Sequence, residues 1–484
     1  MIVPGTRNSW IARRVLRTFT WIACVFGFGT GCTSITAVTP DPALAGTIVT
    51  ISGAGFGPSA GIVTYDDAPI AVLTWSDTEI TATLPASKPD GQYTLAVTGP
   101  GGVVSTRHTL TSYPGTFQRR FPCGTGELEY FVSVRQTADQ GFLLIGNLVD
   151  QIHLGSHVLV VKTDALGIAQ WTRTLSTQGD RAASGDRTTD GGFVVAGYAP
   201  DSFGSGGVSD GVVMKLDAAG NSLWRRVLGA GGYDELTSIR STADDGFIVA
   251  GDTSSYGYYD WDAYLARMNG DGDVVWEKHF GGSGQQTLSA VAVTAGGEII
   301  TAGSTSPTSS QTHAFLVKTD SAGTLLWQHD FDDGRALNLL AVEEASDGGY
   351  VAAGSTSSPD GAVDAYVVKT DSSGQPLWER ALGGAGPNRF GTIVPTADGG
   401  FTLAGETRSA TLVDYDAYLV RLDGTGNVLW ERQFGGSGDD TADDLQPALD
   451  GGWVMAGRTG SFGAASGDGY LVKTDSAGNA PEQP

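Results

Sequence analysis

A segment of about 52 residues recurs from residue 117 onward, and this internal repeat limits the fold more than any other feature of the chain. A tryptophan marks six copies at intervals of 51 to 53 residues, at Trp171, Trp224, Trp276, Trp327, Trp378 and Trp430. An acid-and-glycine turn precedes each one, as in KTDALGIAQW and RLDGTGNVLW. A glycine turn followed by an apolar strand, as in GGFVVAG and GGWVMAG, occurs seven times, about 25 to 30 residues before the tryptophan position. The repeat therefore defines residues 117–480 as one module.

Each copy is predicted to hold four short strands. In the third full copy they are LTSIRST, GFIVAGD, DAYLARM and VVWEKHF. The glycine-rich turns between them, such as ADDG and NGDGD, suit tight hairpins that need positive φ. Four antiparallel strands repeated at this interval are the signature of a β-propeller blade, so the sequence predicts an all-β fold.

The last copy stops after its third strand, at KTDSAGNA, and has no fourth. The segment TFQRRF supplies one, because Phe117 and Phe121 have the same spacing as Trp430 and Phe434. We predict that this first strand completes the last blade and closes the ring, since an open ring would expose unpaired strand edges. Phe117 and the six tryptophans together give seven blades.

Residues that recur in nearly every copy are predicted to be scaffold, because a single active site does not need six or seven copies. The tryptophan is expected to pack between neighbouring blades. The turn aspartate is expected to accept N–H groups of its own turn, at Asp164, Asp217, Asp320, Asp371, Asp423 and Asp475.

Before the repeats, residues 35–112 show alternating strands and glycine turns with no helical period. The segments GTIVTISGAGFG, WSDTEITATLP and GQYTLAVTGPGG resemble an IPT/TIG domain, a small immunoglobulin-like β-sandwich. The resemblance implies a spacer or interaction module without catalytic activity. Residues 113–116 are then a linker to the propeller.

The repeat itself also resembles known families. The D..G..LW pattern is similar to the tryptophan-docking repeat of quinoprotein-like propellers, which include quinone-dependent dehydrogenases and an outer-membrane assembly lipoprotein. The longer pattern DGGFxxAG…DAYLVKTDxxGxxLW resembles bacterial seven-bladed repeats of secreted proteins. Three departures argue against a quinoprotein enzyme: seven copies rather than eight, no adjacent cysteine pair, and no single copy with a distinct set of metal ligands. No catalytic residue and no cofactor is therefore predicted.

The N-terminus resembles an export signal, with basic RNSWIARRVLR before apolar TFTWIACVFGFG. Residues 1–31 are predicted to be a lipoprotein-type signal peptide, because GTGC resembles a bacterial lipobox that ends in Cys32. Ordinary cleavage and an uncleaved anchor are the alternatives. Cys123 is then a lone thiol, with a Cys32–Cys123 bridge as the alternative. The protein is expected in the cell envelope, at the outer membrane or cell surface, or else secreted.

The formal net charge of −24 disfavours contact with nucleic acid and anionic lipid headgroups. Membrane attachment is therefore expected only through the lipid, and the protein is expected to be a monomer. NGDGD, at residues 269–273, has alternating oxygen ligands as a calcium loop would, but occupies an ordinary turn. The acids of GGSGDDTADD, namely Asp439, Asp440, Asp443 and Asp444, are expected to form a solvated loop, with calcium as the alternative.

The predicted ligand-binding residues lie in long loops between second and third strands or, for Tyr233, on a connection between blades, which shares the same face. DTSSYGYYDWD carries Tyr256, Tyr258, Tyr259 and Trp261, to which we add Tyr233 and Tyr415. Exposed aromatic rings near carboxylates suit stacking on sugars or gripping peptide; packing of the loop itself is the alternative. We expect non-catalytic binding of polysaccharide or protein. A propeller enzyme (glycan lyase, hydrolase or quinone-type oxidoreductase) and a periplasmic envelope-assembly scaffold are the alternatives.

Overall fold

The computed structural model describes most of the chain after the leader. The described residues are 34–39, 43–44, 48–85, 91–100, 102, 104–113, 115–122, 127–150, 155–175, 179–200, 208–255, 261–281, 284–308, 311–332, 334–357, 363–383, 386–408, 414–462 and 467–481. The predictions for the leader at residues 1–31, for lipidation of Cys32 and for the role of Cys123 lie outside them. The chain divides into two compact units, and apart from short stretches the first ends at Ser112 and the second begins at Tyr113.

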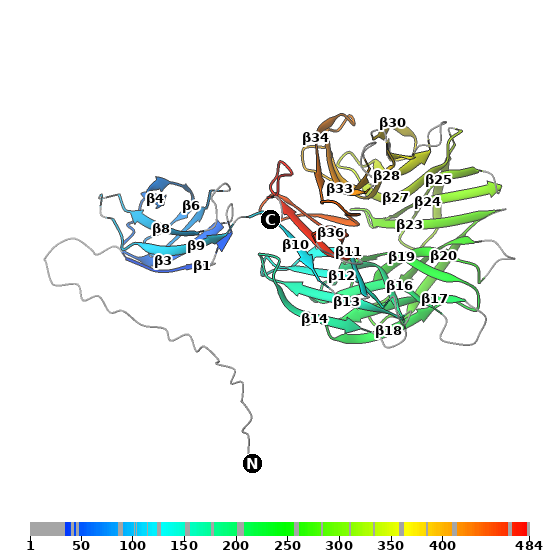
Figure 1. Ribbon diagram of the computed structural model, residues 1–484, viewed down its shortest axis with the longest axis horizontal. Coiled ribbons are helices and arrows are strands. Elements are labelled where there is room, and N and C mark those ends of the chain that lie inside the picture. Colours follow the sequence, from blue (N-terminus) through cyan, green and yellow to red (C-terminus); the bar gives the residue numbers. More distant parts are fainter. Residues whose placement is uncertain are drawn as a thin grey trace, which may run out of the picture. The chain divides into compact units, whose positions relative to one another are not determined.

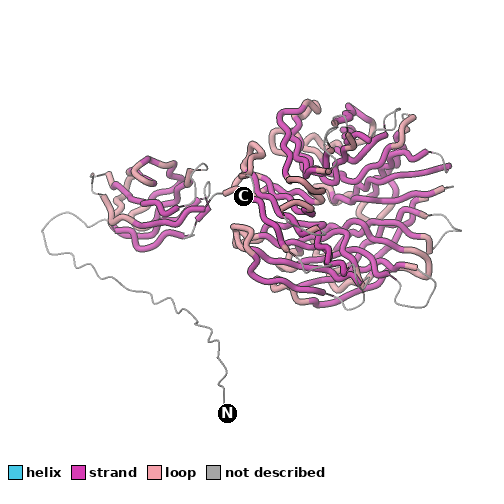
Figure 2. The backbone as a smooth tube through the Cα atoms, viewed as in Figure 1, coloured by secondary structure: helices cyan, strands magenta, loops and turns pink. Residues whose placement is uncertain are grey.

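The described residues form an all-β fold, with strands and loops throughout (Figures 1 and 2). Among these residues there is no helix long and apolar enough to cross a membrane.

The first unit consists of two sheets. One has the order β1–β3–β7–β6, at Ser34–Thr39, Ile48–Ala54, Glu79–Thr83 and Ala71–Trp75. The other has the order β2–β9–β8–β4–β5, at Ala43–Leu44, His108–Tyr113, Gly91–Thr98, Ile62–Tyr65 and Ala68–Pro69.

The core of this unit follows from the alternation in its sequence. Along β3, Val49 and Ile51 are fully buried while the residues between them are not, as predicted for a half-buried strand. Phe56 is completely buried beneath the glycine turn, with its ring centroid 6.3 Å from that of Trp75. The indole N–H of Trp75 donates to the Gly57 carbonyl at 3.0 Å, which fixes the aromatic pair over the turn.

The second unit is made of four-stranded antiparallel sheets. Six of them use consecutive strands: β11 to β14 (Glu127–Gln136, Phe142–Asp150, Gly155–Thr163, Ala169–Leu175), β15 to β18 (Arg181–Arg187, Phe193–Pro200, Ser209–Leu216, Ser222–Leu228), β19 to β22 (Asp234–Ser241, Phe247–Thr253, Asp262–Met268, Val274–Phe280), β23 to β26 (Gln285–Val293, Ile299–Thr308, Gln311–Thr319, Leu325–Phe331), β27 to β30 (Leu337–Glu344, Tyr350–Ser357, Val363–Thr370, Pro376–Leu382) and β31 to β34 (Asn388–Pro395, Phe401–Thr407, Asp416–Leu422, Val428–Phe434).

The remaining sheet of this unit joins its two ends. Its order is β10–β37–β36–β35, at Phe117–Phe121, Asp468–Thr474, Trp453–Thr459 and Asp444–Pro447. The antiparallel register runs from Phe117 opposite Lys473 to Phe121 opposite Gly469, and β10 lies beside the red end of the chain in Figure 1. The predicted pairing of TFQRRF with the last repeat is confirmed.

Side chains of β10 reinforce this pairing. The Tyr470 hydroxyl donates to the Gln118 carbonyl oxygen, and the Gln118 amide donates to the Pro481 carbonyl at 2.7 Å. Arg120 forms an ion pair with Asp468 at 3.1 Å. Phe117 is 3% exposed, and its ring lies 6.0 Å from that of Phe142 in the next sheet. The strand therefore holds both its own sheet and the first repeat.

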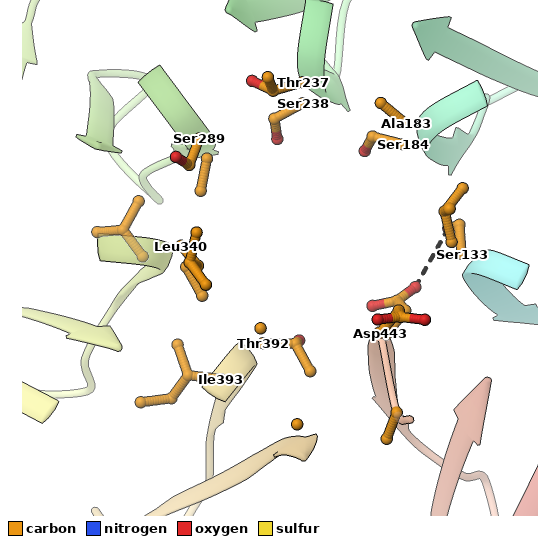
Figure 3. Close-up of a pocket in the computed structure, with 18 of the residues that line it drawn as sticks. Ser133, Ala183, Ser184, Thr237, Ser238, Ser289, Leu340, Thr392, Ile393 and Asp443 are labelled. Atoms are coloured by element: carbon orange, nitrogen blue, oxygen red, sulfur yellow. Dashed lines mark hydrogen bonds between the residues drawn. The ribbon is translucent and has the colours of Figure 1, made fainter. Parts of the chain in front are cut away.

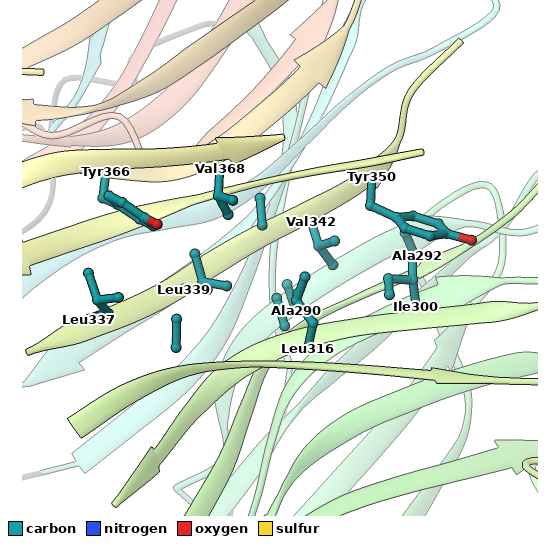
Figure 4. Close-up of a cluster of buried hydrophobic side chains, with 13 residues drawn as sticks. Ala290, Ala292, Ile300, Leu316, Leu337, Leu339, Val342, Tyr350, Tyr366 and Val368 are labelled. Carbon is teal, nitrogen blue, oxygen red and sulfur yellow. The ribbon is translucent and has the colours of Figure 1, made fainter. Parts of the chain in front are cut away.

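The sheets succeed one another in a closed cycle. The first strands of neighbouring sheets are in contact, in the order β11, β15, β19, β23, β27, β31 and β35, and β11 also contacts β35. Each interface buries an apolar layer. Figure 4 shows one of them, where Leu337, Leu339 and Val342 of β27 pack against Ala290, Ile300 and Leu316 of the preceding sheet. Such layers are the main stabilising term, because each fully buried aliphatic side chain contributes about 1.5–3 kcal/mol.

The repeated tryptophans dock on the following sheet, as predicted. The turn glycine of each sheet lies against the aromatic ring of the sheet before it, so that a Cβ at Gly323 would come within 2.9 Å of Trp276 and one at Gly478 within 2.6 Å of Trp430. The same contact joins Gly167 to Phe117, which thereby occupies a tryptophan position. Since these glycines have φ near +80°, both the backbone and the packing require glycine.

The repeated acids have two structural tasks. Each turn aspartate accepts N–H groups of its own turn, as Asp320 does from Ala322 at 2.9 Å and Thr324 at 2.8 Å, which lowers the pKa of that carboxyl. A second acid, beside the hairpin between first and second strands, forms an ion pair with a basic residue of the third strand. This second contact occurs in all seven sheets, at Lys162–Asp139, Lys215–Asp190, Arg267–Asp244, Lys318–Glu298, Lys369–Asp347, Arg421–Asp398 and Lys473–Asp450.

The two acidic segments considered as calcium sites, NGDGD and GGSGDDTADD, lie in different structural surroundings. In NGDGD, the Asn269 side-chain carbonyl accepts from the N–H groups of Asp271 and Asp273, so the segment forms the ordinary repeat turn. The described residues include no group of three or more His, Cys, Asp or Glu placed to hold a metal ion. The prediction of a solvated loop at GGSGDDTADD is wrong for three of its acids: Asp440 is fully buried, while Asp443 and Asp444 are half-buried beside the axis of the unit.

Candidate functional site

The first strands of the second unit surround an axial pocket of about 350 Å³. Figure 3 looks into it and shows side chains from all seven first-strand segments around the opening. The labelled residues are Ser133, Ala183, Ser184, Thr237, Ser238, Ser289, Leu340, Thr392, Ile393 and Asp443. The repeat thus produces one shared cavity, and its chemistry depends on which residue each copy contributes.

A β-bulge shapes the wall of this pocket. The pairing register shifts at the same place in the first strand of six sheets, at Val132, Ala183, Thr237, Ser289, Leu340 and Gly391. All six extra residues line the pocket. A bulge bends its strand and re-aims side chains, so it explains how two successive residues of each strand face the axis.

Hydroxyl groups next to the bulges join neighbouring sheets. Ser133 donates to the Gly185 carbonyl at 2.9 Å, and Ser238 accepts the N–H of Val291 at 3.2 Å. The last sheet has Asp444 where Ser133 and Ser238 stand, and the Asp444 carboxylate accepts the N–H of Val134 at 2.9 Å. In the last sheet Asp444 thus replaces the hydroxyl of this contact with a carboxylate.

Five charged residues form an ionic cluster at one end of the pocket, toward the hairpins between first and second strands. Arg135 contacts Asp444 at 2.5 Å and Asp186 at 3.1 Å, and Arg240 contacts Glu343 at 3.3 Å. Burial alone would lower the pKa of Arg135, but Asp444 and Asp186 raise it above its ordinary value. Burial raises the pKa of Glu343, which Arg240 opposes. Two guanidinium groups and three carboxyl groups are thus held together at this end of the pocket.

The other end opens into a second cavity of about 440 Å³, which we call the mouth pocket. It shares six lining residues with the axial pocket, so the two are continuous. The polar residues that line the mouth pocket are Tyr130, Arg389, Glu406, Thr441, Asp443 and Arg458. They come from the last two repeats and the first, at the ends of the strands where the connections between sheets lie.

Charges in the mouth pocket are only partly paired. The Arg389 guanidinium contacts Glu406 at 2.8 Å, and the side chain remains 50% exposed. Thr441 donates to the Asp443 carboxylate at 2.9 Å. Burial raises the pKa of Asp443 to about 6, with Glu406 also raising it, while Thr441, Arg389 and Arg458 lower it. Asp443 is therefore able to exchange a proton near neutral pH.

Sequence reasoning missed the mouth pocket, although a signal for it exists. The residue directly after the repeated Ala-Gly or Ile-Gly varies strongly between copies: Asn147, Tyr198, Asp252, Ser304, Ser355, Glu406 and Arg458. Across the ladder they meet equally varied partners, such as Tyr130 opposite Asn147 and Arg389 opposite Glu406. Variation at one fixed position of a repeat marks the place where the scaffold does not dictate the residue.

The structure brings two of the predicted ligand-binding residues together. The ring centroids of Tyr233 and Trp261 are 5.7 Å apart with 30° between the planes, and Tyr233 is 43% exposed. Backbone hydrogen bonds fix both residues. The carbonyl oxygen of Tyr233 accepts from the Ser254 N–H, and that of Trp261 accepts from the Gln286 N–H, both at 2.7 Å. Tyr256, Tyr258 and Tyr259 lie outside the described residues.

Tyr415 belongs to a different part of the unit. It follows β32 and precedes β33, whereas Tyr233 and Trp261 flank strands of the β19–β22 sheet. The guanidinium of Arg408 lies 5.7 Å from the Tyr415 ring centroid. The three predicted residues that the structure describes therefore form one aromatic pair and one separate tyrosine.

Comparison with protein families supports both resemblances. Residues 33–118 match the model of the IPT/TIG domain, as predicted from GTIVTISGAGFG and its companions. Residues 313–479 match a model described as outer membrane protein assembly factor BamB, which confirms the likeness of the tryptophan-docking repeat. No curated protein matches the chain in sequence.

Solved structures with similar folds include a protein of unknown function from Dyadobacter fermentans (13% identity, 74% of this chain and 99% of that one, TM-score 0.44). Others are an auxiliary nutrient binding protein from Bacteroides ovatus (11%, 92% and 99%, 0.33) and YCF48 bound to a D1 peptide (12%, 75% and 96%, 0.43).

Proposed function

We propose that the second unit is a seven-bladed β-propeller, closed by its first strand, that acts as a non-catalytic binding protein for polysaccharide or protein. One observation carries the proposal. The repeated aromatic and charged residues are occupied in contacts within and between blades, whereas several unrepeated ones line the mouth pocket or form the Tyr233–Trp261 pair. Binding residues typically vary in identity at positions that a rigid scaffold holds in place.

The aromatic pair is proposed as a contact for the ligand. Tyr233 and Trp261 present large, rigid ring surface at little entropic cost, because their backbones are already hydrogen-bonded. Flat faces of this kind stack on sugar rings or on peptide side chains.

The cellular setting is part of the same proposal. Residues 1–31 direct export and Cys32 carries the lipid, so the protein is held in the cell envelope. The immunoglobulin-like module at residues 35–112 is the spacer, residues 113–116 are the linker and residues 117–480 are the propeller. Labelling with a radioactive or clickable fatty acid tests the anchor, because Cys32→Ser should abolish incorporation.

The binding proposal is tested on an array of neutral and acidic polysaccharides and with proteins from an envelope extract. Tyr233→Ala combined with Trp261→Ala is expected to lower retention of the ligand at least tenfold. Leu223→Ala is the matched control, since Leu223 is an exposed apolar side chain (56%) on a fourth strand. Equal retention by the double variant and the control would contradict the role of the aromatic pair.

A second candidate, an enzyme acting on glycans, is favoured by Asp443. This acid has no counterpart in the other blades, lines both pockets and has its pKa raised to about 6, as a proton donor or acceptor requires. Release of reducing ends or unsaturated products from the array polysaccharides, lost in Asp443→Asn, would replace the binding proposal by this one.

A further inference from the structure

We propose that the mouth pocket binds the carboxylate of an acidic sugar, a uronic acid, through the guanidinium groups of Arg458 and Arg389. The inference deepens the proposed binding function, on which it rests, by naming the chemical class of a ligand. It uses a site separate from the Tyr233–Trp261 pair.

Arg458 is a cation without an ionic partner among the residues that the structure describes. No described carboxylate forms an ion pair with its guanidinium, although its charge helps to lower the pKa of Asp443, which burial raises. The stem of the side chain is held, since a Cβ on Gly467 would lie 3.1 Å from it. The backbone N–H of Arg458 also donates to the Thr441 hydroxyl at 3.2 Å. A half-buried arginine on a fixed stem is placed to receive an anion.

Arg389 supplies the second cation. Glu406 holds it from one side at 2.8 Å, which orients the planar group without using all of its five N–H donors. The side chain is 50% exposed and lines both cavities, so donors remain available toward the mouth pocket. Two guanidinium groups facing one cavity match the paired oxygens of a carboxylate.

The other lining groups suit a sugar ring. Glu406, Asp443 and Thr441 offer oxygen atoms that can accept hydrogen bonds from hydroxyl groups, while Leu128, Tyr130 and Val132 form an apolar wall. A volume of about 440 Å³ lies in the range of small-ligand sites, about 300–1,000 Å³. A simple anion would use the arginines alone, so the mixed lining favours a carboxylate carried on a hydroxylated ring.

The overall charge makes this arrangement selective. A chain with net charge −24 repels anions at a distance, so an acidic ligand requires a local concentration of positive charge. In the mouth pocket Arg389 and Arg458 face Glu406 and Asp443, and burial raises the pKa of Asp443 to about 6, so the positive charge is in excess once Asp443 is protonated.

The test is titration calorimetry of the full chain at pH 6 and low salt with two probes, trigalacturonate and trimannuronate. Each is compared with its methyl ester, which keeps the ring and hydroxyls but removes the charge. We expect at least one acid to bind at least tenfold more tightly than its ester. Arg458→Gln should weaken that binding at least tenfold. Arg107→Gln, which removes the same charge from an exposed pair with Asp67 in the first unit, should leave it within twofold.

Arg389→Gln is the second variant in case Arg458→Gln does not fold, because Arg389 is half exposed. The inference is overturned if neither acid binds, if acid and ester bind equally, or if the folded arginine variants bind like the wild type. Retention of another ligand through Tyr233 and Trp261 in the same preparation would then show that the wider binding function stands without it.

Discussion

Replacing Arg135 by methionine should destabilise the propeller, because it leaves two carboxylates of the ionic cluster without their cation. Removing one partner of a buried ion pair costs about 3–5 kcal/mol. Arg135 is only 8% exposed and serves both Asp186 and Asp444. The two acids keep their backbone partners, the N–H groups of Ser241 and Val134, so the lower end, about 3 kcal/mol, is expected.

The assay is urea unfolding at pH 7, followed by tryptophan fluorescence, on wild type and variant. Arg107→Met is the control, since its pair with Asp67 is exposed and worth about 0–1 kcal/mol. Adding Asp444→Asn to Arg135→Met should recover part of the loss, because it removes one of the two unpaired charges.

The stability loss caused by Arg135→Met should depend on pH, and the pKa of Asp186 decides in which direction. Burial raises the pKa of Asp186, but the charges of Arg135 and Arg240 lower it by more. The pKa of Asp186 in the folded protein is therefore below its ordinary value. The stability it contributes is complete above the unfolded pKa and is lost only as pH falls through the lowered folded pKa. Without Arg135 burial should raise that pKa, so the loss caused by the variant should shrink between pH 7 and pH 5. A loss below about 1 kcal/mol at pH 7, or one independent of pH, would refute the reasoning.

Two further predictions concern the docking contacts and the mouth pocket. Gly478→Ala should lower the melting temperature clearly more than Gly451→Ala does. Both glycines have φ near +80°, but an added Cβ would meet Trp430 at 2.6 Å at position 478 and nothing within 4 Å at position 451. Equal losses would contradict the docking role. Binding of a uronic-acid trimer should strengthen as pH falls from 7 to 5, because Asp443, with a pKa of about 6, becomes neutral while the ligand stays charged. In Asp443→Asn the affinity should no longer change over this range, and a persisting slope would exclude Asp443 as its source.

Much of the scaffold could be predicted because the same strand pattern and turn residues recur in each repeat. The spacing of Trp430 and Phe434 reappears in Phe117 and Phe121, and the structure pairs that strand with the last repeat. The glycine and aspartate of each turn follow from local backbone geometry, which sequence expresses directly.

The functional surface was harder to read, because it depends on distant segments meeting at the axis. Asp443 and Asp444 look like a polar loop in sequence, yet Asp444 contacts Ser133 and Arg135, more than 300 residues earlier, and Asp443 lines both pockets. The ion pair of Lys473 with Asp450 joins a strand to a hairpin 23 residues away, and only the sheet register makes it visible. Arg458 carries no signal of its own in the sequence, because it follows a repeated glycine and several of its neighbours in the mouth pocket come from other repeats.

Hydrogen exchange of residues 117–121 in the full chain tests the closed ring most directly. If β10 is the outer strand of the last blade, peptides covering it should exchange slowly, together with those covering β37 and β36. Complete exchange of residues 117–121 within seconds, while β36 and β37 remain protected, would contradict the closure on which this account of the protein depends.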